Sequence, residues 1–331
     1  MIEQRDAIRQ KLSAFWRNPA AVTGLWAEDA VLDAAWPVNQ LVGAQAILNQ
    51  FVTPMRAALT GLYRRDLMFL GGVNNRAEQG NWCSCVTHYV GTFNAPLFGL
   101  QPSTKLVFLR AGEFYRIVDG QIAEAKIIFD LPDMMRQSGH LPLPSLGTEL
   151  TFPAPATQDG LAPVGDGAAS LALVERMLGD LHVFDPETGT STGQTGSTGA
   201  WADNMMWYGP AGVGSNYEWD GFSKDHRMPF LHAFPDRKGG NHYCRFGDGD
   251  YACVSGWPSM TMTFVGDYLG HKATGQSLTL RVMDFYRIEA NKIAENWVTL
   301  DYGDLFAQMG RDLVAEANTL IDAKAVGSHQ P

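Results

Sequence analysis

A stretch of thirty residues that occurs twice constrains the fold of this chain more than any other feature. Residues 110–139 read RAGEFYRIVDGQIAEAKIIFDLPDMMRQSG, and residues 281–310 read RVMDFYRIEANKIAENWVTLDYGDLFAQMG, at an offset of 171 without a gap. Twelve of the thirty positions are identical, whereas unrelated segments share about two at ordinary residue frequencies. Two copies predict a duplicated domain rather than a solenoid, which needs at least three repeats.

The length and the composition fit two domains. A chain of 331 residues with 45% hydrophobic and 18% charged residues can build two separate cores. Residues 141–167 are rich in proline and glycine, which is typical of a linker. We therefore expect a first unit at residues 1–140 and a second unit at residues 168–320.

Both units show the same order of expected elements. Helical spacing of apolar residues predicts amphipathic helices at 3–17 and from 168 onward, and a further short helix is expected at 20–27. Long strands follow in each unit, and Asp119-Gly120 predicts a hairpin turn between two of them. Helices on one face of an antiparallel sheet define an α+β fold. A curved sheet wrapped round helices leaves a half-closed cavity that suits a small apolar ligand.

Charge and cysteine content exclude several classes of protein. The net charge of −10 argues against nucleic acid and against an anionic membrane surface as partners. The N-terminus is charged and amphipathic, unlike a signal peptide, and we see no apolar run of membrane-spanning length. The four cysteines, at 83, 85, 244 and 253, have no zinc-site spacing. We expect a cytoplasmic protein without a metal.

The strand at 278–288 carries the most informative polar residue. Alternation places Asp284 and Tyr286 on one face with four apolar residues. A carboxylate on an apolar face is costly to ionise, so its pKa rises or a partner neutralises it. A carboxyl group of raised pKa suits proton transfer beside a carbonyl. The same pattern also fits a structural aspartate that is hydrogen-bonded to a tyrosine or an arginine.

Other motifs are less specific. The first unit carries Glu113 and Tyr115 at the positions of Asp284 and Tyr286. Residues 188–199, TGTSTGQTGSTG, fit either a surface insertion or a lid over a pocket. No Gly-x-Ser-x-Gly motif, Walker loop or Rossmann fingerprint is present, which weighs against serine hydrolases, nucleotide users and dehydrogenases.

The segment from Gly266 to Asp301 resembles the SnoaL-like polyketide cyclases. It contains GDYLGHKATGQ, then DFYRI, KIAENW and a final aspartate. That family belongs to the nuclear-transport-factor-2-like, ketosteroid-isomerase-like superfamily. The resemblance therefore implies two tandem α+β-cone, or cystatin-like, domains. It is good over about 170–310 and weaker over about 5–139.

The resemblance also implies a site and a chemistry. The acid/base residue of the cyclases falls on Asp284, and a supporting histidine falls on His271, with no cofactor. The first unit has Glu113 and Leu100 at these positions, so we expect it to be a degenerate site with Glu113 and Tyr115 as remnants. The candidate walls for a small apolar or aromatic carbonyl compound are Trp201, Tyr208, Trp219, Tyr286 and Trp297.

Three functions remain open on the sequence. The first is an aldol-type cyclase that works through an enolate. The second is a non-catalytic ligand-binding or scaffolding protein, since this fold serves both purposes. The third is an isomerase, dehydratase or hydrolase that uses the same pocket. The two units are expected to pair within the chain as a pseudo-dimer, or the chain forms a homodimer.

Overall fold

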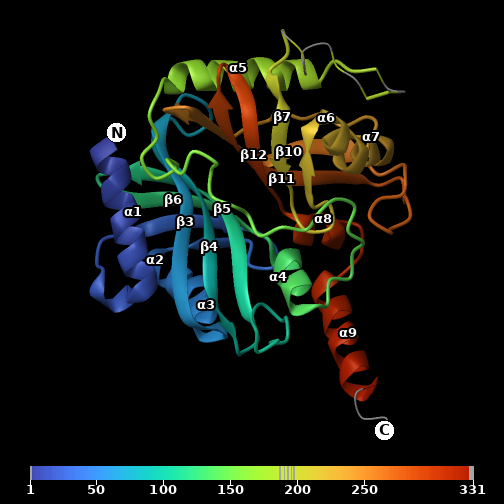
Figure 1. Ribbon diagram of the computed structural model, residues 1–331. Coiled ribbons are helices and arrows are strands. Elements are labelled where there is room, and N and C mark those ends of the chain that lie inside the picture. Colours follow the sequence, from blue (N-terminus) through green and yellow to red (C-terminus); the bar gives the residue numbers. More distant parts are fainter. Residues whose placement is uncertain are drawn as a thin grey trace.

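The computed structural model contains two similar units, each built from one six-stranded sheet and its covering helices (Figure 1). It describes residues 2–327 except 186, 187, 190, 192, 193, 195 and 197. The insertion at 188–199 is thus described only in part, and its interpretation as a lid falls largely outside the described residues.

The first unit starts with helical elements and ends with a short helix. Its helices are α1 (Ile2–Arg17), α2 (Ala44–Ile47), α3 (Thr53–Ala58) and α4 (Leu131–Ser138), with a 3₁₀ turn at Pro19–Ala21 and a π-helical turn at Leu48–Val52. Its strands are β1 (Trp26–Ala34), β2 (Gln40–Val42), β3 (Leu59–Asn74), β4 (Gly80–Phe93), β5 (Leu106–Val118) and β6 (Gln121–Phe129).

The second unit repeats this order. Its helices are α5 (Gly167–Leu181), α6 (Glu218–Phe222), α7 (Met228–Ala233), α8 (Tyr302–Gln308) and α9 (Leu313–Gly327), with a π-helical turn at Ser223–Arg227. Its strands are β7 (Trp201–Tyr208), β8 (Ser215–Tyr217), β9 (Cys244–Asp248), β10 (Tyr251–Thr263), β11 (Ser277–Glu289) and β12 (Lys292–Leu300).

The two sheets have the same topology. Their strand orders are β2-β1-β6-β5-β4-β3 and β8-β7-β12-β11-β10-β9. Neighbouring strands are antiparallel except for one parallel pair in each sheet, β1 with β6 and β7 with β12. The short helix expected at 20–27 is wrong, because β1 begins at Trp26 and its backbone pairs with β6.

The repeated segment forms the predicted strand–strand–helix unit in both copies. Residues 110–139 contain most of β5, all of β6 and α4, and residues 281–310 contain most of β11, all of β12 and α8. Asp130 caps α4 by accepting a 3.0 Å bond from the Asp133 amide. Asp301 caps α8 in the same way at 3.1 Å from the Asp304 amide. The duplication of an α+β fold is therefore confirmed.

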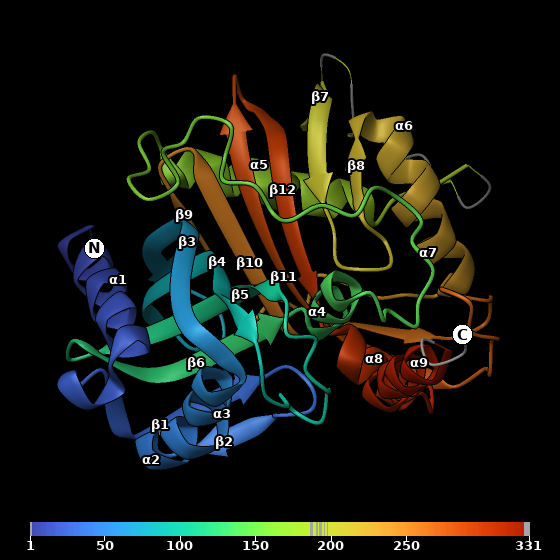
Figure 2. The ribbon, with the colours of Figure 1, turned by 60° about the horizontal axis from the view of Figure 1, so that its bottom comes forward.

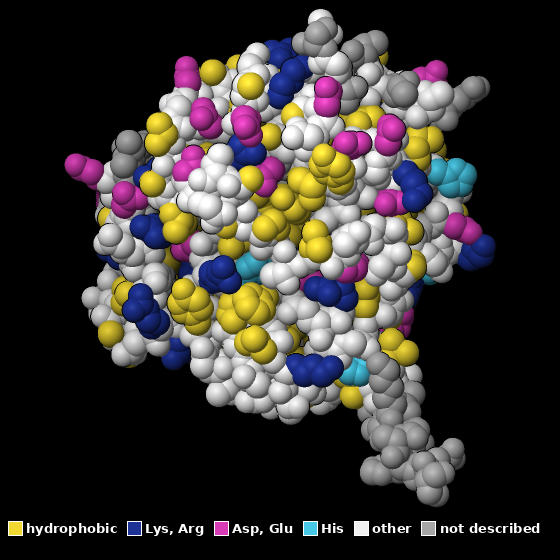
Figure 3. Space-filling view, viewed as in Figure 1, with side chains coloured by type: hydrophobic (Ala, Val, Ile, Leu, Met, Phe, Trp, Pro, Cys, Tyr) yellow, Lys and Arg dark blue, Asp and Glu magenta, His cyan; other side chains and the backbone are white. Residues whose placement is uncertain are grey.

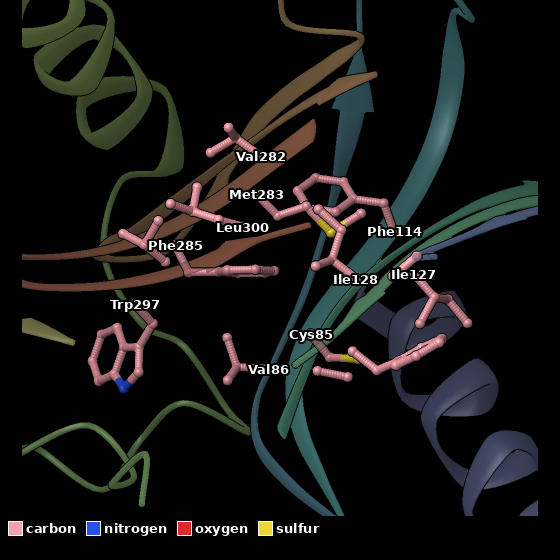
Figure 4. Close-up of a cluster of buried hydrophobic side chains, with 14 of the residues drawn as sticks. Cys85, Val86, Phe114, Ile127, Ile128, Val282, Met283, Phe285, Trp297 and Leu300 are labelled. Carbon is pink, nitrogen blue, oxygen red and sulfur yellow. The ribbon is translucent and has the colours of Figure 1, made fainter. Parts of the chain in front are cut away.

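Equivalent positions of the two sheets contact each other at the centre of the molecule. The rings of Phe114 and Phe285, which are 171 residues apart, lie 5.5 Å apart between the sheets (Figure 4). Gly112 lets side chains of the second sheet pack against β5, because a Cβ there would lie 2.7 Å from Thr299 Oγ1 and 3.4 Å from Met283 Sδ. Self-contact of equivalent positions is the arrangement found at a two-fold axis.

Reciprocal hydrogen bonds support the same symmetry. The carboxylate of Asp130 accepts a 3.0 Å bond from the amide of Ala211 in the other unit. Its counterpart Asp301 accepts a 3.2 Å bond from the amide of Trp36 in the first unit. Figure 2 shows the two sheets meeting near the middle of the molecule, where β5 lies next to β11. The contact is that of an isologous dimer inside one chain.

The linker packs against the body of the protein. Phe152 is buried, and the Ala156 amide donates a 3.1 Å bond to Glu295 of β12.

At the C-terminal end of the described chain, α9 extends away from the two units in Figure 1. In the described part of the chain, no helix has the length and apolarity needed to cross a membrane. Acidic and basic side chains are interspersed on the face in Figure 3.

Candidate active site

A cavity of about 130 Å³ lies in the second unit between the sheet and the helices. Strands β11 and β12 supply one wall, and the π-helical turn and α7 supply another. The end of α5 and the segment before β9 complete it. Its polar or charged lining residues are His182, His226, Arg227, Arg237, His242, Ser259, Asp284, Tyr286 and Asn296.

Asp284 lies in the wall of this cavity, on the face of β11 that alternation predicts. Leu280, Val282 and Tyr286 of the same strand also line it. The carboxylate accepts hydrogen bonds from the Tyr286 hydroxyl and, at 3.5 Å, from Asn296 Nδ2. Burial raises the pKa of Asp284 to about 7, and these two bonds only partly offset that effect. The carboxyl group is therefore poised to exchange a proton near neutral pH.

The raised pKa of Asp284 predicts a gain in stability when its charge is removed. The unfolded chain releases this proton near pH 4, whereas the folded protein holds it up to about pH 7. The stability that the neutral carboxyl contributes is thus complete below pH 4 and lost as the pH rises to 7. We expect Asp284→Asn to raise the free energy of unfolding by about 2–4 kcal/mol at pH 8.

Urea denaturation of both proteins at pH 8 and at pH 4 measures this effect. At pH 4 the wild-type carboxyl is already neutral, so the two proteins should then agree within about 0.5 kcal/mol. An Asp284→Asn protein that is less stable at pH 8 would show that the carboxylate is compensated in the folded state.

His271 does not reach the cavity, which corrects the pairing of His271 with Asp284. His271 lies in the loop before β11, where its Nε2 is 3.2 Å from the carbonyl oxygen of Met309 and its ring stacks on Phe264. The structure instead brings His226 into the lining, from the π-helical turn. Burial, with Arg237 and Arg227 nearby, lowers the pKa of His226 to about 3, so its imidazole is neutral at pH 7.

The candidate aromatic walls divide between the two faces of the sheet. Trp201 and Tyr286 line the cavity, and Trp219 packs behind Trp201 at 6.1 Å between ring centres. Tyr208 and Trp297 lie on the opposite face, which corrects their assignment as walls. The Tyr208 hydroxyl donates to Glu295, and Trp297 Nε1 donates to the linker carbonyl of Pro153. Alternation along β7 and β12 turns these two side chains away.

Glu113 occupies the equivalent of Asp284 in a closed environment. It is fully buried, with Arg64 Nη2 at 2.6 Å and the Tyr115 hydroxyl at 2.5 Å, and Tyr89 also donates to it. Burial alone would raise the pKa of Glu113, but Arg64 and the hydrogen bonds together lower it below its ordinary value. The carboxylate stays ionised inside an ion pair.

The strand register shows why the second unit lacks this ion pair. Arg64 pairs with Tyr89 on β4, and Tyr89 pairs with Leu109 on β5. In the second unit, Leu280 pairs with Met260, and the neighbouring bridge of Lys238 with Thr261 places Gly239 beside Met260. A glycine thus replaces Arg64. The loss of that side chain removes the cation and leaves room for the cavity, which Gly239 and Gly240 line.

A sequence pattern indicates His226 as a cavity residue, but no comparable pattern indicates Arg227 or Arg237. Phe222, His226 and Phe230 are spaced by four residues, so a helix places His226 on the apolar face that packs against the sheet. Arg227 is the next residue, and only the wide π-helical turn brings both into the lining. Within the described residues, no three His, Cys, Asp or Glu side chains converge as metal ligands do.

The fold and the cavity together define an α+β-cone protein whose second unit holds a pocket and whose first unit is closed at the equivalent place. A sequence model of the SnoaL-like polyketide cyclase family matches residues 6–138 and 199–309, which is more than half of the chain. The chain belongs to this family, and it carries the family domain twice. No curated protein matches the sequence.

Three similar solved structures each cover less than half of this chain. AclR from Streptomyces galilaeus is 17% identical, covers 43% of this chain and 100% of its own length, with a TM-score of 0.34. A protein of ketosteroid isomerase-like fold from Catenulispora acidiphila, solved with trimethylamine, is 16% identical over 40% of this chain and 92% of its own, with a TM-score of 0.30. An NTF2-like protein from Burkholderia pseudomallei is 18% identical over 44% and 97%, with a TM-score of 0.32.

Proposed function

We propose that the second unit is a cofactor-independent acid/base catalyst that cyclises a small carbonyl compound through an enolate. The observation that carries the proposal is Asp284, a carboxyl group with a pKa raised to about 7 in the wall of a largely apolar cavity. Membership of the SnoaL-like polyketide cyclase family supports the same chemistry. The Tyr286 and Asn296 side chains hold the carboxylate in place.

The reaction needs only proton transfers and one carbon–carbon bond. Ionised Asp284 takes a proton from the carbon next to a carbonyl, so a C–H bond breaks and an O–H bond forms on the carboxyl. The electron pair of the broken C–H bond stays on the substrate, which becomes an enolate. The enolate carbon then attacks a second carbonyl carbon of the same molecule, and the resulting alkoxide takes the proton back from Asp284. Asp284 is then an ionised carboxylate again, as at the start of the reaction.

His226 is the proposed hydrogen-bond donor to the enolate oxygen. A neutral imidazole in a buried site can donate to an oxyanion without transferring a full proton. Its ring is fixed by stacking on Trp207 at 4.4 Å, and its Nδ1 is buried without a hydrogen-bond partner among the described residues. This role replaces the one that the family resemblance implied for His271.

Deuterium exchange tests the proposal before the natural substrate is known. Acetophenone, phenylacetone and benzoylacetate in D₂O report removal of the α-proton by NMR. We expect the wild-type protein to speed exchange of at least one ketone, and Asp284→Asn not to do so. If no ketone exchanges faster with the wild-type protein than with Asp284→Asn, the proposal is wrong. Binding without exchange would identify the protein as a small-ligand carrier.

The pH dependence follows from the pKa of Asp284. The base acts in its ionised form, so kcat/KM should rise about tenfold per pH unit below 7 and level off above it. The measurement is the rate of α-proton exchange between pH 5 and pH 9 at constant ionic strength. A rate that is constant over this range would exclude Asp284 as the base.

A further inference from the structure

The helical side of the cavity holds two arginines, one buried and one half-buried, that have no acidic partner among the described residues. Arg227 is 5% exposed, and its contacts are the carbonyl of Gly189, at 2.6 Å, and the hydroxyl of Ser191, at 2.9 Å. Arg237 is half-buried over the ring of Phe184, 4.9 Å from the ring centre. No salt bridge among the described residues involves either side chain, although both line the cavity.

Unpaired guanidinium groups in a partly dehydrated wall are costly. An ion that leaves water needs an opposite charge or several hydrogen bonds to offset the loss of hydration. Burial lowers the pKa of both Arg227 and Arg237 to about 10, and the charge of Arg237 adds to this effect at Arg227. No acidic group among the described residues forms a salt bridge that would offset the shift. Both remain charged at neutral pH, so the cavity carries two positive charges on this side.

Hydrogen-bonding atoms in the same walls also lack partners. Arg237 Nη1, Trp201 Nε1, His226 Nδ1 and Ser259 Oγ are buried with no hydrogen-bond partner among the described residues, and all four residues line the cavity. Buried polar groups are normally satisfied, so each such atom calls for an explanation. At least two of these atoms, on Arg237 and Trp201, are N–H donors, and an acceptor-rich group would satisfy them.

The first unit shows what the same fold does without these charges. Its π-helical turn, Leu48–Val52, has Phe51 and Val52 at the positions of His226 and Arg227. Both are fully buried in the core. The buried Arg64 of the first unit lies instead on the sheet and pairs directly with Glu113. In the second unit the carboxylate and the cations lie on different walls, with the cavity between them.

We propose that the cavity of the second unit binds a substrate with a carboxylate group, which Arg227 and Arg237 hold on the helical side while the carbonyl end faces Asp284. Planar guanidinium groups bind carboxylates through paired hydrogen bonds, and the geometry fixes orientation as well as charge. The substrate class is a small oxo acid with an apolar body. This names the substrate of the enzyme proposed above, although binding can be measured without turnover.

Benzoate and benzamide test the inference by calorimetry. They have nearly the same shape and differ in charge. We expect the wild-type protein to bind benzoate at least tenfold more tightly than benzamide. In Arg237→Met the preference should fall to twofold or less, and in Arg237→Lys it should be intermediate. The exposed Arg176→Met, with the same change in charge, should keep the wild-type preference.

Three outcomes would overturn the inference: equal affinities in the wild-type protein, no binding of benzoate at millimolar concentration, or a full preference in Arg237→Met. The melting temperature of ligand-free Arg237→Met gives an independent check, because the loss of an uncompensated charge should not lower it. A large drop would assign Arg237 to structure instead. Asp284→Asn separates the two proposals, since it should abolish exchange and keep the benzoate preference.

Discussion

Asp284→Asn is expected to lower kcat for α-proton exchange by about 10²–10⁴-fold while leaving the fold intact. The change removes the proton acceptor and alters the shape of the side chain very little. The Asn side chain can still accept from the Tyr286 hydroxyl, which now bonds to the carboxylate. Rates with saturating ketone, together with circular dichroism spectra of both proteins, measure the effect.

Glu113→Gln is the matched control in the first unit. Glu113 is bound by Arg64, Tyr115 and Tyr89 and has no exposed surface. It cannot meet a substrate, so turnover per folded molecule should stay within a few-fold of wild type. If Glu113→Gln abolishes exchange and Asp284→Asn does not, the active site has been placed in the wrong unit.

Arg64→Met is expected to cost about 3–5 kcal/mol of the free energy of unfolding at pH 7. Arg64 bonds Glu113 at 2.6 Å and Asp66 at 2.8 Å, and all three side chains are buried. Without the guanidinium, two carboxylates remain in a dry core. Urea denaturation at pH 7 measures the loss. Part of the stability should return at pH 4 to 5, where the carboxylates can take up protons.

Arg116→Met provides the comparison for an ordinary ion pair. Arg116 lies 3.3 Å from Glu124, and its side chain is 28% exposed. Such pairs contribute about 0–1 kcal/mol, because water screens them. Equal losses for Arg64→Met and Arg116→Met would mean that the buried cluster of the first unit contributes no more than a partly exposed pair.

The repeat predicted the architecture because it covers the two strands and the helix that lie at the centre of each unit. Alternation along β11 then placed Asp284 on the correct face. The sequence predicts a helix where strand β1 begins, and the difference has a physical reason. Residues 26–34, WAEDAVLDA, contain mainly good helix formers and acids. Backbone pairing with β6 makes them a strand, and tertiary contacts of this kind override local preference.

The cavity lining was harder to predict than the fold. The aromatic character of Tyr208 and Trp297 suggests pocket walls, whereas strand alternation turns both side chains to the linker side of the sheet. The family motif indicates His271 as a site residue. Whether the loop that carries His271 reaches the cavity depends on tertiary packing, which the motif does not encode. Arg227 and Arg237 are brought together by a π-helical turn and by a chain reversal after α7, and neither leaves a periodic signal in the sequence.

The covalent union of two self-contacting units has a consequence for how such a protein can diverge. In a dimer of identical chains, every substitution appears on both sides of the axis, so a change that closes one pocket closes both. Here Phe114 faces Phe285 across the axis, but the codons are separate. One half can therefore carry Arg64 in a filled interior, while the other half carries a glycine and a cavity at the equivalent place. The closed unit serves its neighbour as a permanent partner that dilution cannot remove.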